Sequence, residues 1–283
     1  MKILVSGAGG GLGHLIIEQL LIEGHTVIAT SRNAEKAKAL PFYSKVTYLP
    51  FDINAEYNIN LFDFFHRPDA MIHLAWDKLN EYKNEVHLTD ILPKHKAFLH
   101  NLIENGLKDI TCVGTCYEYG LQEGELKEDM ASLPMMPYPQ AKNLLRIFLE
   151  ELQTTHAFQL KWPRVFYVFG AIKERKNLYT LLMDAISRGD AQFNMSGGEQ
   201  IRDFLSPEEI ANIIIKIAIQ NKLVGIVNCC SGKPIKLKTK IEDFLKENNY
   251  RIQLNLGHYP YPDYEPMETW GSVKKLRTIG GKI

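Results

Sequence analysis

Tyr138 and Lys142 are the side chains whose types and spacing best suit acid–base chemistry. They stand in the segment Tyr-Pro-Gln-Ala-Lys, at the start of a pattern that predicts a helix over 140–156. A spacing of four residues places both side chains on one helix face, within reach of a common ligand. An ammonium beside a phenol favours the phenolate and lowers its pKa from about 10 toward the working range of an acid–base catalyst. Such a pair also occurs by chance, so its meaning depends on the elements around it.

Thr115 is the third candidate for this chemistry. It directly follows the apolar segment 110–114, which predicts a buried strand. At the carboxyl edge of a doubly wound sheet its hydroxyl would point into the ligand crevice. A threonine at a strand end is also common as a helix cap or turn residue. Thr115, Tyr138 and Lys142 in this order, behind a nucleotide-binding loop, favour the catalytic interpretation.

That loop is the glycine-rich turn near the N-terminus. Gly7, Gly10 and Gly13 lie between a predicted strand over 2–6 and a predicted helix over 12–23. Glycine permits a tight turn and a close approach of backbone N–H groups to phosphates, and the helix N-terminus adds its positive dipole. A second strand, predicted over 26–30, supplies the context of dinucleotide binding. The alternative is a glycine-rich turn with no ligand.

Strand and helix patterns alternate along the chain, which predicts an α/β fold with a doubly wound parallel sheet of the Rossmann type. We expect a dinucleotide-binding domain over residues 1–170, to which some later segments return, and a small substrate-binding cap formed mainly by residues 171–283. The aromatic and proline-rich segment 259–262 is expected to be a lid or loop. Further predicted strands are 46–50, 70–74, 110–114, 159–166, 200–205 and 225–229, and further predicted helices are 34–40, 84–105, 178–188, 207–220 and 237–247.

Composition narrows the classes of protein. The 283 residues contain 33 Lys and Arg and 33 Asp and Glu, so the formal charge is zero and a nucleic-acid-binding surface is not expected. The four cysteines show no metal-ligand spacing and suit free thiols in a reducing compartment. The first apolar run is too short for a signal peptide, and no apolar segment approaches the length of a membrane span. We therefore expect a cytoplasmic protein without membrane or metal.

With these motifs the chain resembles the extended short-chain dehydrogenase/reductases, in particular the nucleotide-sugar epimerase/dehydratase family, over almost its whole length. Thr115 with Gly120, and Tyr138 with Lys142, match the family's Ser/Thr…Tyr-Gly and Tyr-x-x-x-Lys motifs. The segment 73–76, His-Leu-Ala-Trp, matches the family's His-Leu-Ala-Ala run beside the cofactor. Other matches are the glycine loop, Asp52-Ile53 after the third strand, Arg164…Gly170 and Arg202-Asp203-Phe204.

The resemblance implies a role for each matched residue. Tyr138 is then the proton donor or acceptor, Lys142 holds the nicotinamide ribose, and Thr115 hydrogen-bonds the reacting oxygen. Arg202 would contact the diphosphate or ribose of a nucleotide-linked substrate. Tyr167 stands where the family usually has a substrate-binding Asn, which suggests a different nucleotide or sugar. The expected cofactor-binding residues are Gly7, Gly10, Gly11, Leu12, Gly13, Ser31, Arg32, Asp52, Ile53, Leu74, Ala75, Trp76, Tyr138 and Lys142.

Comparison with family members also narrows the reaction. Sugar 4,6-dehydratases carry an acid two residues after the catalytic Thr, often in Thr-Asp-Glu, and the two positions after Thr115 here are Cys116 and Tyr117. Cys116 stands one place after Thr115, whereas bifunctional epimerase/reductases carry cysteine two places after their Ser. A ketoreductase acting on a nucleotide-linked 4-keto-6-deoxy sugar remains, with an NAD-retaining 4-epimerase as the alternative. A non-catalytic sensor or partner-binding module is disfavoured because such proteins usually lack the Tyr/Lys pair.

The end of the second strand bears on the choice of cofactor. NAD-binding folds usually place an acid there for the ribose 2′-hydroxyl, but residues 29–33 contain none. Ser31 and Arg32 suit a 2′-phosphate, and Lys36 adds positive charge. Three basic residues could bind a phosphate of the substrate or could form a solvated run of charges: Lys173, Arg175 and Lys176. We expect NADP(H), with NAD as the alternative, and a homodimer formed through the apolar stripes of the helices predicted over 84–105 and 140–156.

Overall fold

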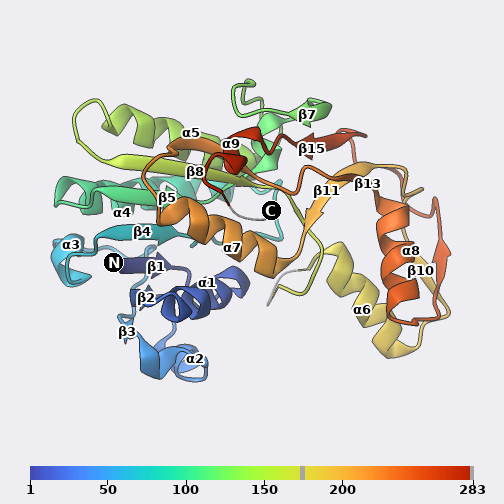
Figure 1. Cartoon of the computed structure of the whole chain (residues 1–283), viewed down its shortest axis with the longest axis horizontal. Coiled ribbons are helices and arrows are strands. Elements are labelled where there is room, and N and C mark those ends of the chain that lie inside the picture. Colours follow the sequence, from blue (N-terminus) through green and yellow to red (C-terminus); the bar gives the residue numbers. More distant parts are fainter. Residues whose placement is uncertain (173–175, 281–283) are drawn as a thin grey trace.

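One large parallel sheet organises the protein. The computed structural model describes residues 1–172 and 176–280, and within them the sheet has eight strands (Figure 1). Their order is β3-β2-β1-β4-β5-β8-β12, and the short β6 also pairs with β8. All of these pairings are parallel, so the carboxyl ends of the strands meet at one edge of the sheet. The strands are β1 (Lys2–Ser6), β2 (Thr26–Thr30), β3 (Thr47–Tyr48), β4 (Ala70–His73), β5 (Asp109–Cys112), β6 (Gly114–Thr115), β8 (Gln159–Val165) and β12 (Gly225–Cys229).

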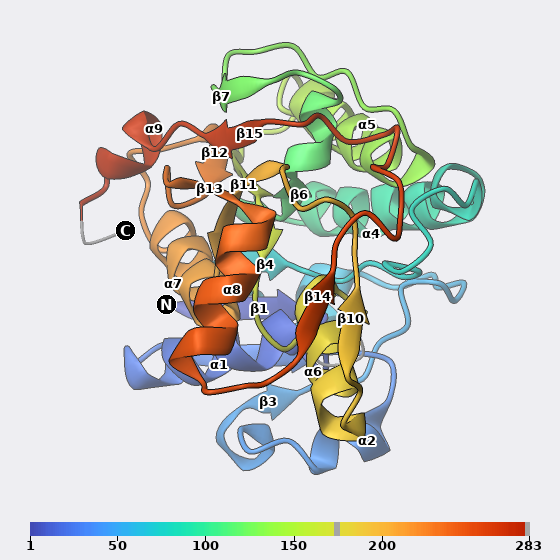
Figure 2. The same cartoon turned by 90° about the vertical axis from the view of Figure 1, so that its right-hand side faces the viewer.

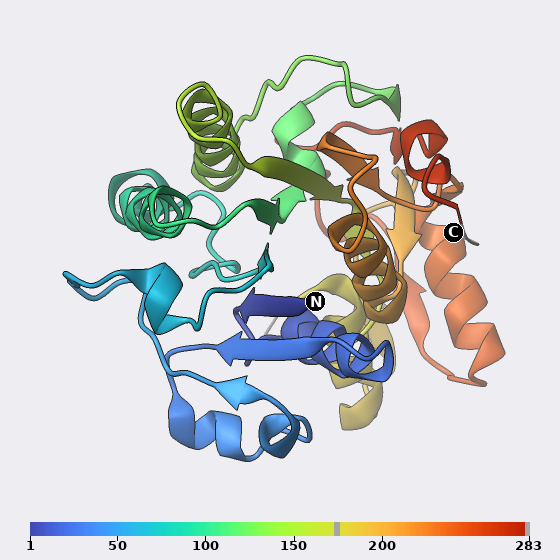
Figure 3. The ribbon, with the colours of Figure 1, turned by 60° about the vertical axis from the view of Figure 1, so that its left-hand side comes forward.

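Helices cover both faces of this sheet (Figure 3). On one face, α1 (Gly11–Ile22) and α7 (Pro207–Ala218) pack together over a core that includes Ile3 and Val5. On the other face, α4 (Leu92–Glu104) and α5 (Pro137–Leu152) lie over Leu4 and the neighbouring strands. Alternate residues of β1 thus enter different cores, as expected for a strand that is buried on both faces. The predicted α/β fold is confirmed.

A smaller group of elements lies beyond the carboxyl edge of the sheet (Figure 2). In it, α6 (Leu178–Arg188) and α8 (Leu237–Glu247) share an apolar cluster that includes Leu182 and Ile241. The strands here are β9 (Tyr167–Val168), β10 (Gln192–Asn194), β11 (Ile201–Leu205), β13 (Pro234–Lys236) and β14 (Gln253–Asn255), paired as β13-β11-β9 and β10-β14. The remaining elements are α2 (Ala34–Lys38), α3 (Leu61–Phe64), α9 (Lys274–Arg277), the paired β7 (Gly124–Leu126) and β15 (Thr269–Gly271), and the short helices η1 (Tyr43–Lys45), η2 (His87–Ile91) and η3 (Cys116–Tyr119).

Two elements differ from the sequence expectation in ways that affect the site. The helix expected over 140–156 begins at Pro137, because proline is well suited to the first helical position, and it ends at Leu152. Tyr138 and Lys142 therefore lie on its first two turns. The strand expected over 110–114 is split into β5 and β6, so that Thr115 ends β6 instead of following a single strand.

In the described ranges, 1–172 and 176–280, no helix has both the length and the apolar character needed to span a bilayer.

Candidate active site

Two glycines of the turn from β1 into α1, Gly7 and Gly13, leave no room for a side chain. Gly7 has φ of 77°, and a Cβ there would lie 2.8 Å from the backbone nitrogen of Ala75. A Cβ on Gly13 would lie 2.3 Å from the carbonyl oxygen of Gly7. Gly10 is the N-cap of α1 and has no side chain to bond the helix N–H groups, and the first turn carries no acid. This open, positive helix end fits a pyrophosphate, so these residues would hold the diphosphate of a dinucleotide.

Among the other predicted cofactor residues, Leu74 and Ser31 lie close to this loop. Leu74 donates its backbone N–H to the carbonyl of Ser6 at 3.2 Å, which places the segment after β4 beside the glycine turn. Ser31 hydrogen-bonds the Tyr48 hydroxyl at 2.7 Å at the end of β2. Ile53 is buried, whereas Asp52 is exposed and accepts a hydrogen bond from its own loop. Gly11 is buried and Leu12 partly buried on the first turn of α1.

Tyr138 and Lys142 are buried at the start of α5, with 7% and 3% of their surface exposed. The indole of Trp76, in the segment that follows β4, lies next to both of them. Its ring lies 4.3 Å from the Lys142 Nζ and 6.2 Å from the centre of the Tyr138 ring. Trp76 directly follows Ala75, the residue in contact with Gly7. Burial lowers the pKa of Lys142, while Cys112 and Glu118 act in the opposite direction. A cation over an aromatic face is held by the ring quadrupole, so Trp76 helps to keep Lys142 charged and in place.

A fully buried ion pair holds the backbone of Thr115. Glu118 accepts the Thr115 N–H at 2.8 Å and bonds the Nε of Arg164 at 2.9 Å. The Trp162 indole N–H donates to the same carboxylate at 3.0 Å. Gly114 is required here, because a Cβ would lie 2.2 Å from the Trp162 Nε1. Arg164, which the family resemblance singled out, therefore positions Thr115 instead of contacting the crevice.

Buried histidines lie behind the Tyr/Lys pair. The Trp76 N–H donates to the Nδ1 of His87 at 3.1 Å, and the His87 ring packs 5.4 Å from that of Tyr138. The Nε2 of His73 hydrogen-bonds the Nδ1 of His95 at 2.8 Å. Burial is the main cause that lowers the pKa of all three. These rings are thus neutral at pH 7 and leave Lys142 as the cation in contact with Trp76.

A run of aromatic rings leads from Tyr138 toward Arg202. Tyr82 stacks on Tyr138 at 5.4 Å and contacts Tyr117 at 5.7 Å, and Tyr117 meets Tyr167 edge-on at 5.9 Å. The guanidinium of Arg202 lies 4.9 Å from the centre of the Tyr167 ring. The two residues expected at the substrate, Tyr167 and Arg202, are therefore neighbours and continuous with the Tyr/Lys pair.

Glu265 completes this side of the site, and the sequence analysis missed it. Its carboxylate bonds Arg202 at 2.9 Å and accepts the Tyr117 hydroxyl at 2.9 Å. Nothing in the local pattern around residue 265 indicates this contact, because its partners lie far away in the chain. Tyr82 and Tyr117 were also not assigned to the site, although the position of Tyr117 close to Thr115 was a signal. Lys173 and Arg175, considered for phosphate binding, lie outside the described residues.

Cysteine and metal chemistry find no support in the described part of the chain. Cys116 is a buried free thiol, and burial raises its pKa, which keeps it protonated. This agrees with leaving it unassigned as a base. No group of three or more His, Cys, Asp and Glu side chains within 1–172 and 176–280 is arranged to hold a metal ion.

Comparison with known proteins shows the family of this chain. The model of the NAD dependent epimerase/dehydratase family matches residues 3–230. The chain belongs to this family. It is also 31% identical over 273 residues to a dTDP-6-deoxy-L-talose 4-dehydrogenase (NAD(+)) from Aggregatibacter actinomycetemcomitans, a match that covers 96% of this chain and 100% of the relative.

Solved structures share the fold of this family member at low identity. A UDP-N-acetylglucosamine 4-epimerase from Methanobrevibacter ruminantium M1, in complex with UDP-N-acetylmuramic acid, superposes with a TM-score of 0.85 at 20% identity. A UDP-glucuronic acid 4-epimerase from Bacillus cereus, in complex with UDP-glucuronic acid and NAD, gives 0.82 at 20% identity. Each match covers 99% of this chain and 92% of the other. The chain is accordingly an NAD(P)-dependent enzyme of the epimerase/dehydratase family with the Rossmann-type fold.

Proposed function

We propose that this enzyme reduces the C4 keto group of a nucleotide-linked 4-keto-6-deoxy sugar. The observation that carries the proposal is the position of Trp76, which contacts both Lys142 and Tyr138 and directly follows the residue packed on the glycine loop. This contact supports a role of Tyr138 and Lys142 as an acid–base pair beside the predicted dinucleotide site. The 4-dehydrogenase name of the curated relative supports the same carbon and a 6-deoxy sugar.

A dinucleotide held by the glycine loop would supply the hydride that adds to the carbonyl carbon of the substrate. The Tyr138 hydroxyl gives its proton to the carbonyl oxygen, and the resulting phenolate regains a proton from solvent. Lys142 stabilises that phenolate by its charge, and the Thr115 hydroxyl hydrogen-bonds the reacting oxygen. The buried Glu118–Arg164 pair keeps Thr115 in position, because both of its side chains are fully enclosed. Proton transfer by a positioned group of this kind contributes about 10²–10⁴-fold in rate.

We further propose that the nucleotide part of the substrate lies along Tyr117, Tyr167 and Arg202. A guanidinium suits the diphosphate or ribose of such a substrate, and the ring of Tyr167 supports its planar face. Arg202 is paired with Glu265 in the structure, so an anionic substrate competes with this carboxylate for Arg202.

For the cofactor we propose NADP(H) in preference to NAD(H). Ser31 and Arg32 stand at the end of β2, and residues 29–33 include no acid to bond a ribose 2′-hydroxyl. The curated relative is named as an NAD(+) enzyme, so the preference needs a direct measurement. Initial rates with NADPH and NADH decide it. A kcat/KM with NADH that equals or exceeds the value with NADPH refutes the preference. Arg32→Ala is expected to weaken the binding of NADPH far more than the binding of NADH.

The reaction is tested with a dTDP-linked 4-keto-6-deoxyhexose and NADPH. We expect loss of the NADPH absorbance only when both substrates are present, a sugar product heavier by two hydrogens, and no turnover with Tyr138→Phe. Interconversion of 4-hydroxyl epimers without net use of cofactor, together with NAD that survives purification, would establish the 4-epimerase instead. Binding of dinucleotide with neither activity would indicate a sensor.

A further inference from the structure

Arg32 does not stand alone at the end of β2. Its guanidinium makes a two-pronged contact with Asp77, at 2.8 Å from Nη2 to Oδ1 and 3.2 Å from Nη1 to Oδ2. Asp77 belongs to the segment after β4. Because β1 lies between β2 and β4 in the sheet, this pair joins the two loops that flank the glycine turn. The carboxylate therefore occupies the donors of Arg32 that a 2′-phosphate would use.

A third loop fixes the carboxylate in place. The side-chain amide of Asn54 donates to the Asp77 Oδ2 at 2.9 Å, and the Asn54 backbone N–H is held by Asp52 at 3.0 Å. Asp77 is thus bonded from the segment after β3 as well as from the end of β2. This second contact orients the carboxylate without neutralising it, because Asn54 is uncharged.

The ion pair is accessible enough for another anion to break it. The Arg32 side chain is 56% exposed and that of Asp77 is 31% exposed. Exposed pairs are weak because water screens them. A phosphate with nearly two charges competes for Arg32 against a carboxylate with one, but that carboxylate, held by Asn54, then repels the phosphate. A cofactor with a free 2′-hydroxyl needs no such exchange.

We propose that Asp77 is a specificity-determining residue that limits the preference for NADP(H) over NAD(H) by pairing with Arg32. The inference rests on the proposed binding of the 2′-phosphate by Arg32. The proposal predicts that removing the charge of Asp77 selectively strengthens the binding of 2′-phosphorylated ligands, and that this gain in affinity requires Arg32.

Titration calorimetry on the full chain tests this with 2′,5′-ADP, 5′-AMP, NADPH and NADH. Asp77→Asn is expected to raise the affinity for 2′,5′-ADP and for NADPH by about fivefold, the upper value for an exposed pair. The affinity for 5′-AMP and for NADH should be nearly unchanged. In an Arg32→Ala background the gain should disappear. Asp190→Asn is the matched control, because Asp190 forms a similar exposed pair with Arg188 at 2.6 Å.

The proposal is overturned if Asp77→Asn leaves the ratio of NADPH to NADH affinity unchanged, or shifts it equally with and without Arg32. Failure of the cofactor assignment has a different signature. A wild-type chain that binds NADH better than NADPH refutes the NADP(H) preference, while the comparison of Asp77→Asn with wild type still measures the role of Asp77.

Discussion

The buried pair His73–His95 is expected to make the stability of this enzyme sensitive to mild acid. Both rings are enclosed, with 0% and 2% of their surface exposed. Burial, and then the charge of Lys142, lower the pKa of His95 to about 3 from an ordinary value of 6.5. Burial, and then His95, also lower the pKa of His73 far below that value. The folded chain therefore keeps both rings neutral at a pH where the unfolded chain protonates them.

The direction and size of the effect follow from proton linkage. Below pH 6.5 the unfolded state binds more protons than the folded state, so the free energy of unfolding falls as the pH falls. The contribution of His95 is fully present above about pH 6.5 and is lost progressively toward pH 3. At about 1.4 kcal/mol for each pH unit, His95 alone accounts for a loss of about 2 kcal/mol between pH 7 and pH 5. His73 acts in the same direction.

Urea denaturation at pH 7 and pH 5 measures this loss. His95→Gln, which cannot titrate, is expected to reduce the difference between the two pH values by about 2 kcal/mol, whatever its effect at pH 7 alone. His258→Gln is the control, because His258 is exposed and remains hydrated in both states. If wild type and His95→Gln lose the same free energy of unfolding from pH 7 to pH 5, the reasoning is wrong.

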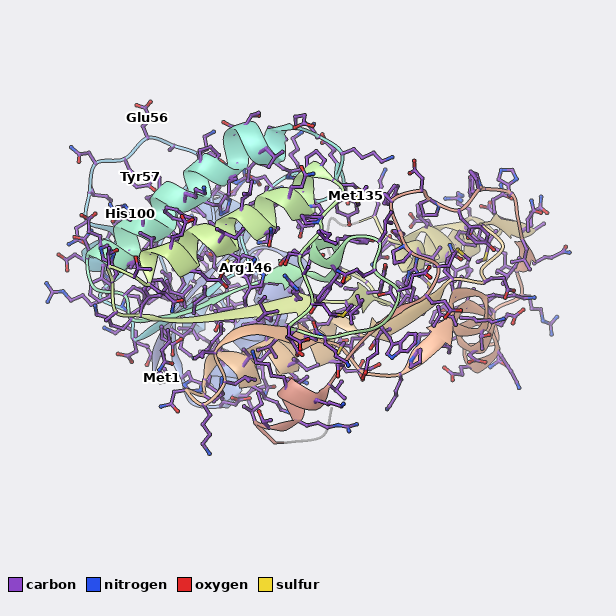
Figure 4. The ribbon with its side chains drawn as sticks, turned by 90° about the horizontal axis from the view of Figure 1, so that it is seen from above. Met1, Glu56, Tyr57, His100, Met135 and Arg146 are labelled. Carbon is purple, nitrogen blue, oxygen red and sulfur yellow. The ribbon has the colours of Figure 1, made fainter. Side chains whose placement is uncertain are left out.

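Four further outcomes are expected. Tyr138→Phe should lower turnover by about 10²–10⁴-fold and leave the affinity for NADPH nearly intact. Lys142→Ala should lower both turnover and the affinity for NADPH. Substantial turnover in Tyr138→Phe would contradict the assignment of Tyr138 as the proton donor. Trp76→Leu removes the aromatic face under the Lys142 ammonium, worth about 0.5–2 kcal/mol, so kcat should fall by about 2–30-fold, and Trp76→Phe should lose less. Glu118→Gln breaks a fully buried ion pair and should cost about 3–5 kcal/mol in urea denaturation, with the exposed Glu125→Gln as control. Light scattering should give the mass of two chains. The helices α4 and α5 lie side by side on one flank, where Figure 4 labels His100 and Arg146, and Leu144 of α5 is 42% exposed. A monomer mass at micromolar concentration would exclude the dimer.

The order of elements and the shared helix of Tyr138 and Lys142 could be predicted from the sequence because they depend on local rules. Glycine spacing reports where the backbone must turn closely, and the structure places backbone atoms where the Cβ of Gly7 or Gly13 would be. A spacing of four residues puts Tyr138 and Lys142 on one helix face wherever that helix lies. The predicted start of this helix, at residue 140, was wrong, because α5 begins at Pro137. The error left the spacing of Tyr138 and Lys142 on the helix unchanged.

Only the tertiary structure decided which distant side chains complete the site. Trp76 was assigned to the cofactor by its place in a motif, but its contact with Lys142 arises because α5, which packs against β6 and β8, begins beside the segment that follows β4. Glu265 reaches Arg202 from a segment 63 residues away, and Asp77 reaches Arg32 from 45 residues away. Periodicity and spacing describe neighbours along one element, and they carry no information on which loops meet across a sheet edge. That choice depends on the strand order β2-β1-β4 and on the path of the C-terminal segment, which follow from the packing of the whole chain.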